Sequence, residues 1–480
     1  MKELASRALN LAQTLGATYA DIRIAHRESQ SVIVKNGTVE AISLSSNQGF
    51  GVRVIADGAW GFASSARLER NVIDEITALA IDIAQASALV EGARLDLGPP
   101  EVHVDTYHTP VEVDPFQVSL DQKVDLLLAC DEAMRRTRGV AVAEGNMLFM
   151  RKSQLFASTE GSLIEQEITE TGAGLVATAV GHDEVQRRSH PNSFGRNQGT
   201  AGYEFIEKCD LLANAERLGE EAVALLSARQ CPSQVTTLIL GPTQLALQIH
   251  ESCGHPTELD RALGTEASYA GTSFLTPDKL GGFPYGSDIV NITADATVVG
   301  GLGTFGYDDE GVAAQRTHLI KDGIFVGYLT SRETASRFGQ RSNGAMRADG
   351  WGNIPLIRMT NINLEPGEWE LADLFADTDD GIYMEMNKSW SIDDKRLNFQ
   401  FGTEMAYEIK KGKRGDLLKN ATYAGMTPQF WASCDAICND KYWDVWGTPN
   451  CGKGQPSQVA HVGHGASTAR FRNVHVGVMR

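Results

Sequence analysis

The chain contains 480 residues, with 61 acidic and 43 basic side chains and a formal net charge of −18. This acidic balance argues against a protein that binds nucleic acid, because such proteins need basic patches over phosphate. The length exceeds the usual limit for one hydrophobic core, so two domains are expected, and no apolar run approaches the roughly 20 residues that span a bilayer.

The N-terminal segment predicts a helix followed by short strands. Its opening residues have the apolar spacing of a helix and no signal-peptide core, so a cytoplasmic protein is expected. Hairpin turns are expected at Asn36-Gly37, Gln48-Gly49 and Asp57-Gly58. The seven cysteines are odd in number and irregularly spaced, which also suits a reducing compartment rather than a disulfide framework.

Further helices are predicted over residues 68–88, 120–136 and 203–228, with strands between the last two. The polar segment 187–203 is expected to be a long flexible loop, and a possible gate near a functional site. The turn at Cys231-Pro232 then leads into mainly β segments, consistent with an antiparallel sheet or barrel-like domain. The predicted division of the chain is therefore 1–230 and 231–480.

The most informative motif is HESCGH, which begins at His250 and places two histidines and a glutamate in the spacing HExxxH. Zinc is bound by neutral imidazole, thiolate and carboxylate ligands, and a catalytic site keeps one position open for water. His250 and His255 are therefore candidate zinc ligands. Glu251 is a candidate general base that takes a proton from metal-activated water. The alternative is that both histidines only cap or pack the end of a helix.

The spacing of this motif is one residue longer than the HExxH of familiar zinc peptidases. In a regular α-helix, residues five apart lie about 140° apart around the axis, so His250 and His255 could not both face one ion. A π-bulge or local unwinding would restore the alignment. Residues 242–249 have the pattern of a helix, and Gly254 and Pro256 permit distortion after it. The motif is thus predicted at the C-terminal end of a buried, locally distorted helix.

The third ligand has several candidates. Glu258 and Asp260 follow the motif directly, but both could equally be solvated carboxylates or belong to the N-terminus of a helix. Cys451 lies in the segment GTPNCGKGQPSQVAHVGHG, whose glycines and prolines predict a shaped loop rather than a helix or central strand. His461 and His464 in the same segment could replace an assigned ligand, but roles behind the ligands or at the surface are expected instead.

Three further features favour a structural interpretation over a functional one. The glycine-rich run at Val299 does not open a helix, so a turn is expected there rather than a phosphate loop. The carboxylates of residues 308–310 fit no calcium-loop spacing and predict a solvated loop or a substrate-facing rim. Cys434 and Cys438 form a CxxxC without the paired spacing of a metal site, so two buried thiols are expected.

Several ordered blocks of the chain resemble the TldD/PmbA family of metallopeptidases, nearly end to end. The blocks are HESCGH with PTELD, FGYDDEGVAAQRTHLIKDGIFVGYLTSR from Phe305, IRMTNINLEPG from Ile357, NCGKGQP from Asn450, and the N-terminal VIVKNGTVEAISLSSNQGFGVRVIADGAWGFASSA. The chain is similar to the TldD kind of subunit because it keeps HExxxH, which the PmbA (TldE) kind lacks. One departure is Pro256, where better-known TldD sequences carry glycine; it bears on the path of the chain after His255.

The resemblance implies a site in which His250, His255 and Cys451 bind zinc, with one ion per active subunit and Glu251 as catalytic base. It also implies an α+β fold, with an N-terminal α/β sandwich-like domain and a mainly antiparallel, barrel-like β domain that carries the metal helix. The implied assembly is a heterodimer with a PmbA/TldE-type sister subunit, with a homodimer as second choice. Neither nucleic acid nor a membrane is an expected partner.

The expected activity is hydrolysis of peptide bonds in unfolded or flexible polypeptides. In the expected mechanism, zinc polarises the scissile carbonyl and its water, and Glu251 deprotonates that water and later protonates the leaving amine. A thiolate ligand lowers the net charge of the site to roughly +1, which makes Glu251 more important. Two alternatives remain: a catalytically silent partner or regulatory subunit, as older family names that invoke DNA gyrase modulation suggest, and a hydrolase of a specific modified peptide.

Overall fold

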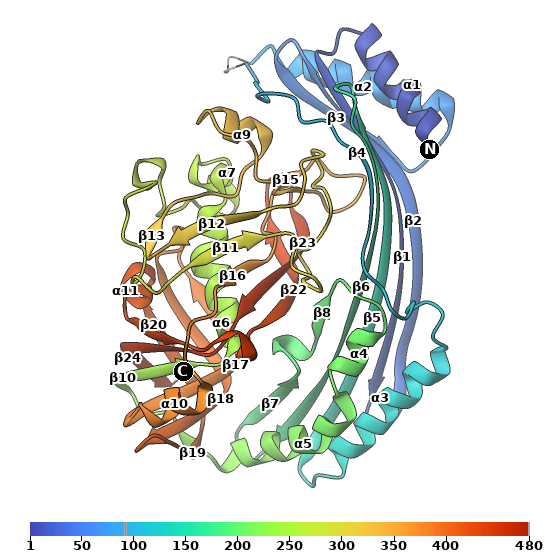
Figure 1. Ribbon diagram of the computed structural model, residues 1–480. Helices are drawn as coiled ribbons and strands as arrows, with labels where there is room; N and C mark the ends of the chain where they lie inside the picture. Colours follow the sequence, from blue (N-terminus) through green and yellow to red (C-terminus); the bar gives the residue numbers. More distant parts are fainter. Residues whose placement is uncertain (91, 93, 479–480) are drawn as a thin grey trace.

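The computed structural model describes residues 1–90, 92 and 94–478. Its N-terminal half is built on one long, curved sheet whose concave side faces the C-terminal half (Figure 1). The strands run in the order β3-β2-β1-β5-β6-β4, with β7 and β8 also paired to β6. The strands are β1 (Tyr19–Lys35), β2 (Thr38–Ala56), β3 (Ala59–Ser65), β4 (Val104–His108), β5 (Val140–Ser158), β6 (Leu163–Val180), β7 (Val185–His190) and β8 (Asn197–Gly199).

Helices cover the two ends of this sheet and form two separate hydrophobic cores. At one end lie α1 and α2, and at the other α3 and α5 (Figure 1). The predicted helices at 68–88 and 120–136 are confirmed, whereas the one at 203–228 is interrupted where Asp210 adopts a left-handed backbone with φ 46°. The helices are α1 (Lys2–Thr14), α2 (Arg70–Ser87), α3 (Leu120–Arg135), η1 (Ser193–Gly195), α4 (Glu204–Lys208) and α5 (Leu211–Ser227).

The strands of the N-terminal half are longer than the sequence predicts. The turns at Asn36-Gly37 and Asp57-Gly58 are confirmed, but β2 continues through Gln48-Gly49 without a turn. Gly49 instead allows the ring of Trp351, from the C-terminal half, to pack directly on the strand. A Cβ at this position would lie 2.4 Å from that ring. The glycine is therefore required by tertiary packing, which local turn chemistry does not reveal.

The prediction of a flexible loop at residues 187–203 is wrong. The segment contains part of β7, all of η1 and β8, and most of its residues are buried. Its polar groups are used between the two halves of the molecule: the backbone N–H and hydroxyl of Ser189 both donate to Glu404, and the amide of Asn192 donates to the carbonyl of Gly447. Polar composition here reflects an interface rather than exposure to solvent.

The C-terminal half contains a closed five-stranded barrel in the order β17-β10-β24-β20-β18, in which β18 pairs again with β17. Beside it lie a sheet in the order β13-β12-β11-β16 and the two-stranded ribbon β22–β23. The predicted α+β class with a barrel-like C-terminal domain is thus confirmed, and the division at residue 230 stays a prediction. The described residues include no helix that is long and apolar enough to cross a membrane.

The strands of this half are β9 (Arg229–Gln230), β10 (Gln234–Leu240), β11 (Ile292–Asp295), β12 (Arg316–Lys321), β13 (Ile324–Phe325), β14 (Met346–Arg347), β15 (Leu356–Ile357), β16 (Ile362–Leu364), β17 (Asp380–Ile392), β18 (Asn398–Lys410), β19 (Lys413–Lys419), β20 (Ala421–Met426), β21 (Cys434–Ile437), β22 (Asp444–Lys453), β23 (Gln458–Ala466) and β24 (Ala469–Val478). The helical segments are α6 (Pro242–Ile249), η2 (His250–Gly254), η3 (His255–Thr257), α7 (Leu259–Ala262), α8 (Ala267–Ala270), η4 (Pro277–Lys279), α9 (Arg332–Ser336), α10 (Leu371–Ala376), α11 (Thr427–Ala432) and η5 (Asp440–Tyr442).

Candidate metal centre

The helix α6 does not end at the motif but widens into a π-helical turn. Residues His250–Gly254 form this turn, and the chain then tightens at His255. The extra residue of HExxxH is absorbed by the wider turn, so the imidazoles of His250 and His255 come together with ring centroids 4.8 Å apart. Gly254 allows Met359 to pack closely on this turn, since a Cβ there would lie 2.3 Å from the sulfur of Met359. The predicted distortion of the helix is therefore confirmed.

Cys451 reaches the two histidines from the ribbon β22–β23. Its Sγ lies 3.7 Å from Nε2 of His255, and one ligand atom from each of His250, His255 and Cys451 lies within 4.8 Å of the others. The prediction of a shaped loop around Cys451 is wrong, because Cys451 belongs to β22 and pairs with Ala460 of β23. A bulge before Cys451 interrupts the pairing. The glycines and prolines thus accompany an irregular hairpin.

The Cys451 thiol differs from the other cysteines in its electrostatics. All seven cysteines lie in the described residues and are free and buried. Burial raises the pKa of six of them. Burial would also raise the pKa of Cys451, but His255 and Arg358 outweigh it, and the net pKa is lowered. Cys451 is therefore the cysteine best suited to act as a thiolate ligand, and Cys434 and Cys438 are buried thiols.

Both motif histidines are oriented by neighbours that leave Nε2 available. Nδ1 of His255 lies 2.9 Å from a carboxylate oxygen of Glu258, which can only accept, so Nδ1 carries the proton. Nδ1 of His250 lies 2.8 Å from Nε2 of His464. Such outer partners fix the ring orientation of metal-binding histidines. Glu258, expected to be a solvated carboxylate or a third ligand, instead holds His255, and His464 holds His250.

A buried network supports Glu258. Lys453 lies 3.4 Å from Glu258 and donates to Asp260 at 2.7 Å, and the side chains of Lys453 and Glu258 are fully buried. Burial raises the pKa of Glu258, but Lys453 and His255 outweigh it and the net pKa is lowered. Glu258 therefore stays ionised and keeps accepting from His255.

Replacing Glu258 by glutamine is expected to weaken metal binding by about 10- to 100-fold, because an amide orients and polarises the imidazole of His255 less strongly. Competition with a chromophoric chelator measures this affinity. Asp260→Asn is the matched control, since Asp260 contacts Lys453 but not His255. Equal affinities for the two variants would contradict the role given to Glu258.

Glu251 lies in a position suited to a general base. Its side chain is buried and accepts from Nη1 of Arg396, which the chain places in the turn between β17 and β18. Burial would raise the pKa of Glu251, but His250 and Arg396 outweigh it, and the net pKa is lowered. The carboxylate is therefore ionised and able to accept a proton.

Arg396 was not predicted from the sequence. It has a left-handed backbone with φ 64°, which non-glycine residues rarely adopt and which is typical of functional sites. The turn that carries it is held by neighbours: Arg261 donates to the carbonyl of Asp394, and the hydroxyl of Thr427 donates to the carbonyl of Arg396. The letters DDKR indicate a turn, but nothing in them indicates its contact with residue 251.

The ligand set fits a zinc ion. With Zn–N distances of about 2.0–2.1 Å and a Zn–S distance of about 2.3 Å, tetrahedral ligand atoms lie about 3.5 Å apart. The 3.7 Å between Cys451 and His255 is close to this value, and the remaining separations stay within 4.8 Å. Two imidazoles and a thiolate are also ligands that zinc prefers.

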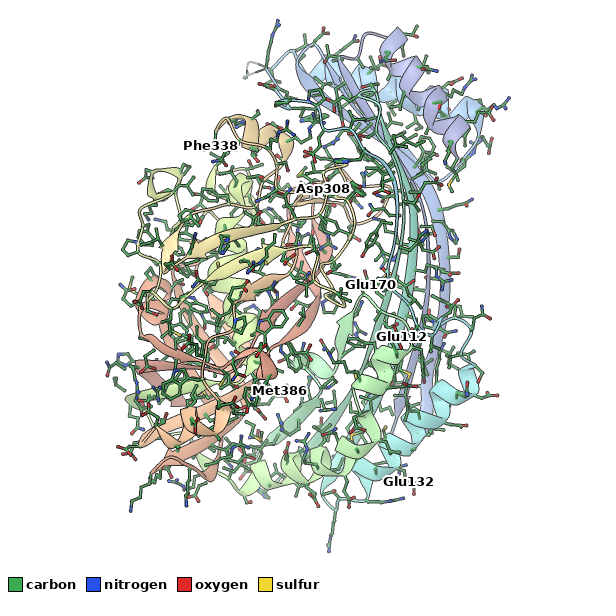
Figure 2. All side chains as sticks on the ribbon, viewed as in Figure 1. Glu112, Glu132, Glu170, Asp308, Phe338 and Met386 are labelled. Carbon is green, nitrogen blue, oxygen red and sulfur yellow. The ribbon has the colours of Figure 1, made fainter. Side chains whose placement is uncertain are left out.

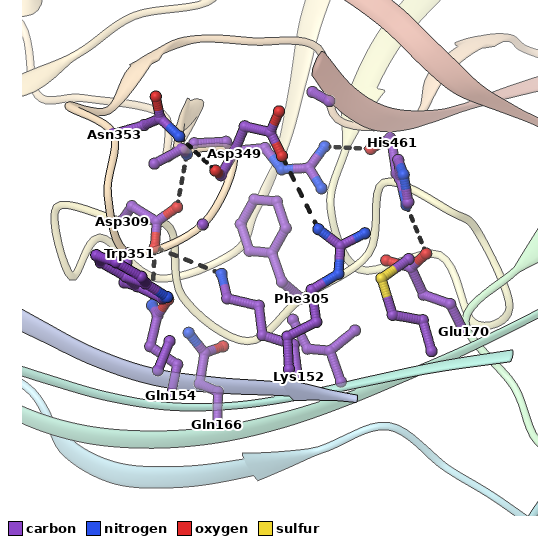
Figure 3. Close-up of a pocket in the computed structure, with 18 of the residues that line it drawn as sticks. Lys152, Gln154, Gln166, Glu170, Phe305, Asp309, Asp349, Trp351, Asn353 and His461 are labelled. Atoms are coloured by element: carbon purple, nitrogen blue, oxygen red, sulfur yellow. Dashed lines mark hydrogen bonds and ion pairs between the residues drawn. The ribbon is translucent and has the colours of Figure 1, made fainter. Parts of the chain in front are cut away.

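The second histidine of HVGH contacts the candidate metal centre through His250, and the first points away from it. Side chains alternate along a strand, so His461 and His464 lie on opposite faces of β23. His461 pairs with Glu170 of β6 at 2.6 Å and lines a cavity of about 340 Å³ between the long sheet and the ribbon (Figure 3). Among the described residues, neither histidine belongs to the three-residue cluster.

Residues 308–310 lie in the same interface, so the prediction of a solvated loop is wrong, whereas a substrate-facing rim stays a prediction, since Asp308 and Asp309 line the cavity. Asp308 and Glu170 lie in the region between the two halves of the molecule (Figure 2). All three carboxylates of the segment are buried. Asp309 pairs with Arg23 at 3.9 Å, and Glu310 pairs with Arg53 at 3.1 Å. The acidic run therefore joins the C-terminal half to the long sheet.

Three family models match successive parts of the chain. The PmbA/TldA metallopeptidase domain 1 matches residues 20–86, the central domain matches 113–230, and the C-terminal domain matches 233–478. A metalloprotease from Methanocaldococcus jannaschii is 31% identical and covers 94% of this chain and 95% of its own length. A zinc metalloprotease TldD homolog from Saccharolobus solfataricus is 22% identical, over 89% of this chain and 90% of that protein.

Solved structures show the same fold. A Thermotoga maritima protein described as a candidate modulator of DNA gyrase matches with a TM-score of 0.78 and 18% identity over 99% of both chains. TldE from Thermococcus kodakarensis matches with a TM-score of 0.75 and 16% identity, over 99% of this chain and 100% of that one. The sequence relatives are named metalloproteases, and together with the buried His/His/Cys cluster they point to a metal centre.

Proposed function

The chain belongs to the TldD/PmbA family of metallopeptidases, and on this premise we propose that it is a zinc-dependent peptidase that hydrolyses peptide bonds of unfolded or flexible polypeptides. His250, His255 and Cys451 are the proposed metal ligands, and Glu251 is the proposed general base. The observation that carries the proposal is the buried cluster of these three ligand atoms directly beside an ionised carboxylate. The proposed assembly is a heterodimer with a PmbA/TldE-type sister subunit, with a homodimer as second choice.

Each residue has a separate task in the proposed reaction. A zinc ion at this site would supply a Lewis acid that polarises the scissile carbonyl and acidifies water. Glu251 accepts a proton from the attacking water and returns it to the leaving amine. His464 and Glu258 hold His250 and His255 in orientation. Arg396 holds the carboxylate of Glu251 toward the site.

Replacing Arg396 by glutamine is expected to lower kcat by about 10- to 100-fold with little change in KM, because the base loses the contact that positions it. Steady-state kinetics on a quenched peptide measures both constants, and zinc content is expected to stay unchanged. Arg396→Lys should recover part of kcat, and Lys395→Gln, at the exposed neighbouring position, is the matched control. A change confined to KM would contradict a positioning role.

The proposed function is tested by incubating a permanently unfolded polypeptide with the protein and identifying products by mass spectrometry. The protein is used as purified, after chelation, and after chelation followed by zinc, each with and without the sister subunit. Cleavage that chelation removes and zinc restores is the expected result. Cleavage that survives chelation contradicts a metallopeptidase. Absence of cleavage in every sample favours the silent-partner or specific-peptide alternative.

A further inference from the structure

A cavity of about 400 Å³ lies beside the proposed metal centre, between the long sheet and α6. Thr243, Ala246 and Leu247 line it from α6. These three positions share one helical face with His250, because residues three, four and seven apart lie on the same side of a helix. Asn450, which directly precedes Cys451, lines the same cavity. The cavity therefore runs along the face of α6 that leads to His250, and it also touches the residue before Cys451.

The walls of this cavity contain buried polar atoms that have no hydrogen-bond partner. They are Oδ1 of Asn146, Oδ1 of Asn387 and Nε of Arg196. Buried polar atoms are nearly always paired in folded proteins, so such exceptions need an explanation. Two carbonyl acceptors and one guanidinium donor suit a ligand with both N–H groups and an anionic oxygen. A peptide provides both.

Arg196 has no ion pair among the described residues. The charge of Glu170 influences Arg196, but Glu170 already accepts hydrogen bonds from His461 and Gln198. Burial lowers the pKa of Arg196, and Glu170 offsets this in part. Glu144, the carboxylate in the cavity wall, lies 3.9 Å from Lys35 and not within pairing distance of Arg196. A partly buried guanidinium without a counterion is therefore available to an anionic ligand.

We propose that this cavity is a substrate subsite in which Arg196 binds a carboxylate of the peptide close to the scissile bond. The inference rests on the proposed peptidase function. The planar guanidinium matches a carboxylate in two parallel hydrogen bonds, and the size of the cavity falls in the range of small-ligand sites, about 300–1,000 Å³. The carboxylate comes either from an aspartate or glutamate side chain or from the C-terminus of the peptide.

The subsite is tested by peptide binding to the Glu251→Gln protein, in which turnover does not interfere. One labelled, unstructured peptide is made in two pairs of forms. The first pair differs only in a C-terminal acid or amide, and the second only in a glutamate or glutamine beside the cleavage position. Fluorescence anisotropy is expected to give a Kd about tenfold or more lower for a carboxylate form than for its neutral counterpart. The form that gains affinity identifies the source of the carboxylate.

Arg196→Gln, added to the Glu251→Gln protein, is expected to bring the ratio of the two Kd values, neutral form over carboxylate form, close to one. Arg196→Lys should give an intermediate ratio. Arg138→Gln, which removes an exposed arginine, is the control and should keep the full ratio. The subsite would be overturned if the Arg196→Gln protein still bound the carboxylate form more tightly than the neutral form. It would also be overturned if the protein with Arg196 intact bound both forms of each peptide equally. Discrimination by Arg196 without cleavage in the functional test would favour the silent-partner or specific-peptide alternative and retain the carboxylate site. Cleavage without discrimination would support the peptidase and overturn the subsite.

Discussion

The Glu251→Gln protein is expected to hydrolyse an unfolded polypeptide with a kcat about 10³-fold below that of the wild type, since general bases contribute about 10²- to 10⁴-fold. Glutamine has nearly the same shape and still accepts a hydrogen bond from Arg396, but it cannot take a proton from water. The change therefore removes the proposed chemistry and preserves the packing of a buried side chain. Initial rates on a quenched peptide measure the loss.

Two controls separate loss of the base from loss of the site. Elemental analysis should give the same zinc content for wild type and variant, because Glu251 is not a proposed ligand. Asp394→Asn removes an exposed carboxylate from the turn that carries Arg396, and it should leave kcat unchanged. If Glu251→Gln retained more than a tenth of the wild-type kcat with full zinc, the proton acceptor would be another group.

The metal helix could be predicted from the sequence because its chemistry and geometry are local. Two histidines five residues apart cannot face one ion on an α-helix, so the motif itself implies the distortion that the π-helical turn provides. Gly254 within the turn and Pro256 after it supply the matching backbone properties. The assignment of Cys451 did not follow from spacing and depended on the family resemblance.

The sequence allowed a supporting role for His461 and His464 without choosing between them, and it gave no sign of Arg396, because these groups meet the site through space. His464 is 214 residues from His250, and Arg396 is 145 residues from Glu251. No periodicity connects such positions in a single sequence. The contact of Arg396 with Glu251 is what marks it, and this contact exists only in the folded chain.

Three of the wrong predictions share one physical cause. Gly49 was interpreted as part of a turn, residues 187–203 as a loop and residues 308–310 as solvated, because glycine and polar residues usually indicate exposed segments. All three regions instead lie against the opposite half of the molecule. An interface between two large elements buries polar groups in pairs, and pairing is invisible until both partners are in place.

One of these pairings centres on Arg53 of β2. Its guanidinium contacts Asp21 of β1 at 2.7 Å and Glu310 of the C-terminal half at 3.1 Å. The three side chains are at most 3% exposed. The guanidinium also lies 4.4 Å from the centroid of the Trp60 ring. Arg53 is thus a buried cation shared by two carboxylates, one from each half.

Replacing Arg53 by methionine is expected to lower the free energy of unfolding by about 3–5 kcal/mol, because it leaves two buried carboxylates without their counterion. Urea-induced unfolding followed by tryptophan fluorescence should show an earlier midpoint. Neutralising the carboxylates as well, with Asp21→Asn and Glu310→Gln, should recover most of the loss, since the cost comes from uncompensated charge rather than from missing volume. Arg67→Met, which removes an exposed ion pair with Glu69, should leave the midpoint unchanged. A single variant as stable as the wild type would show that the Arg53 cluster makes no net contribution to stability.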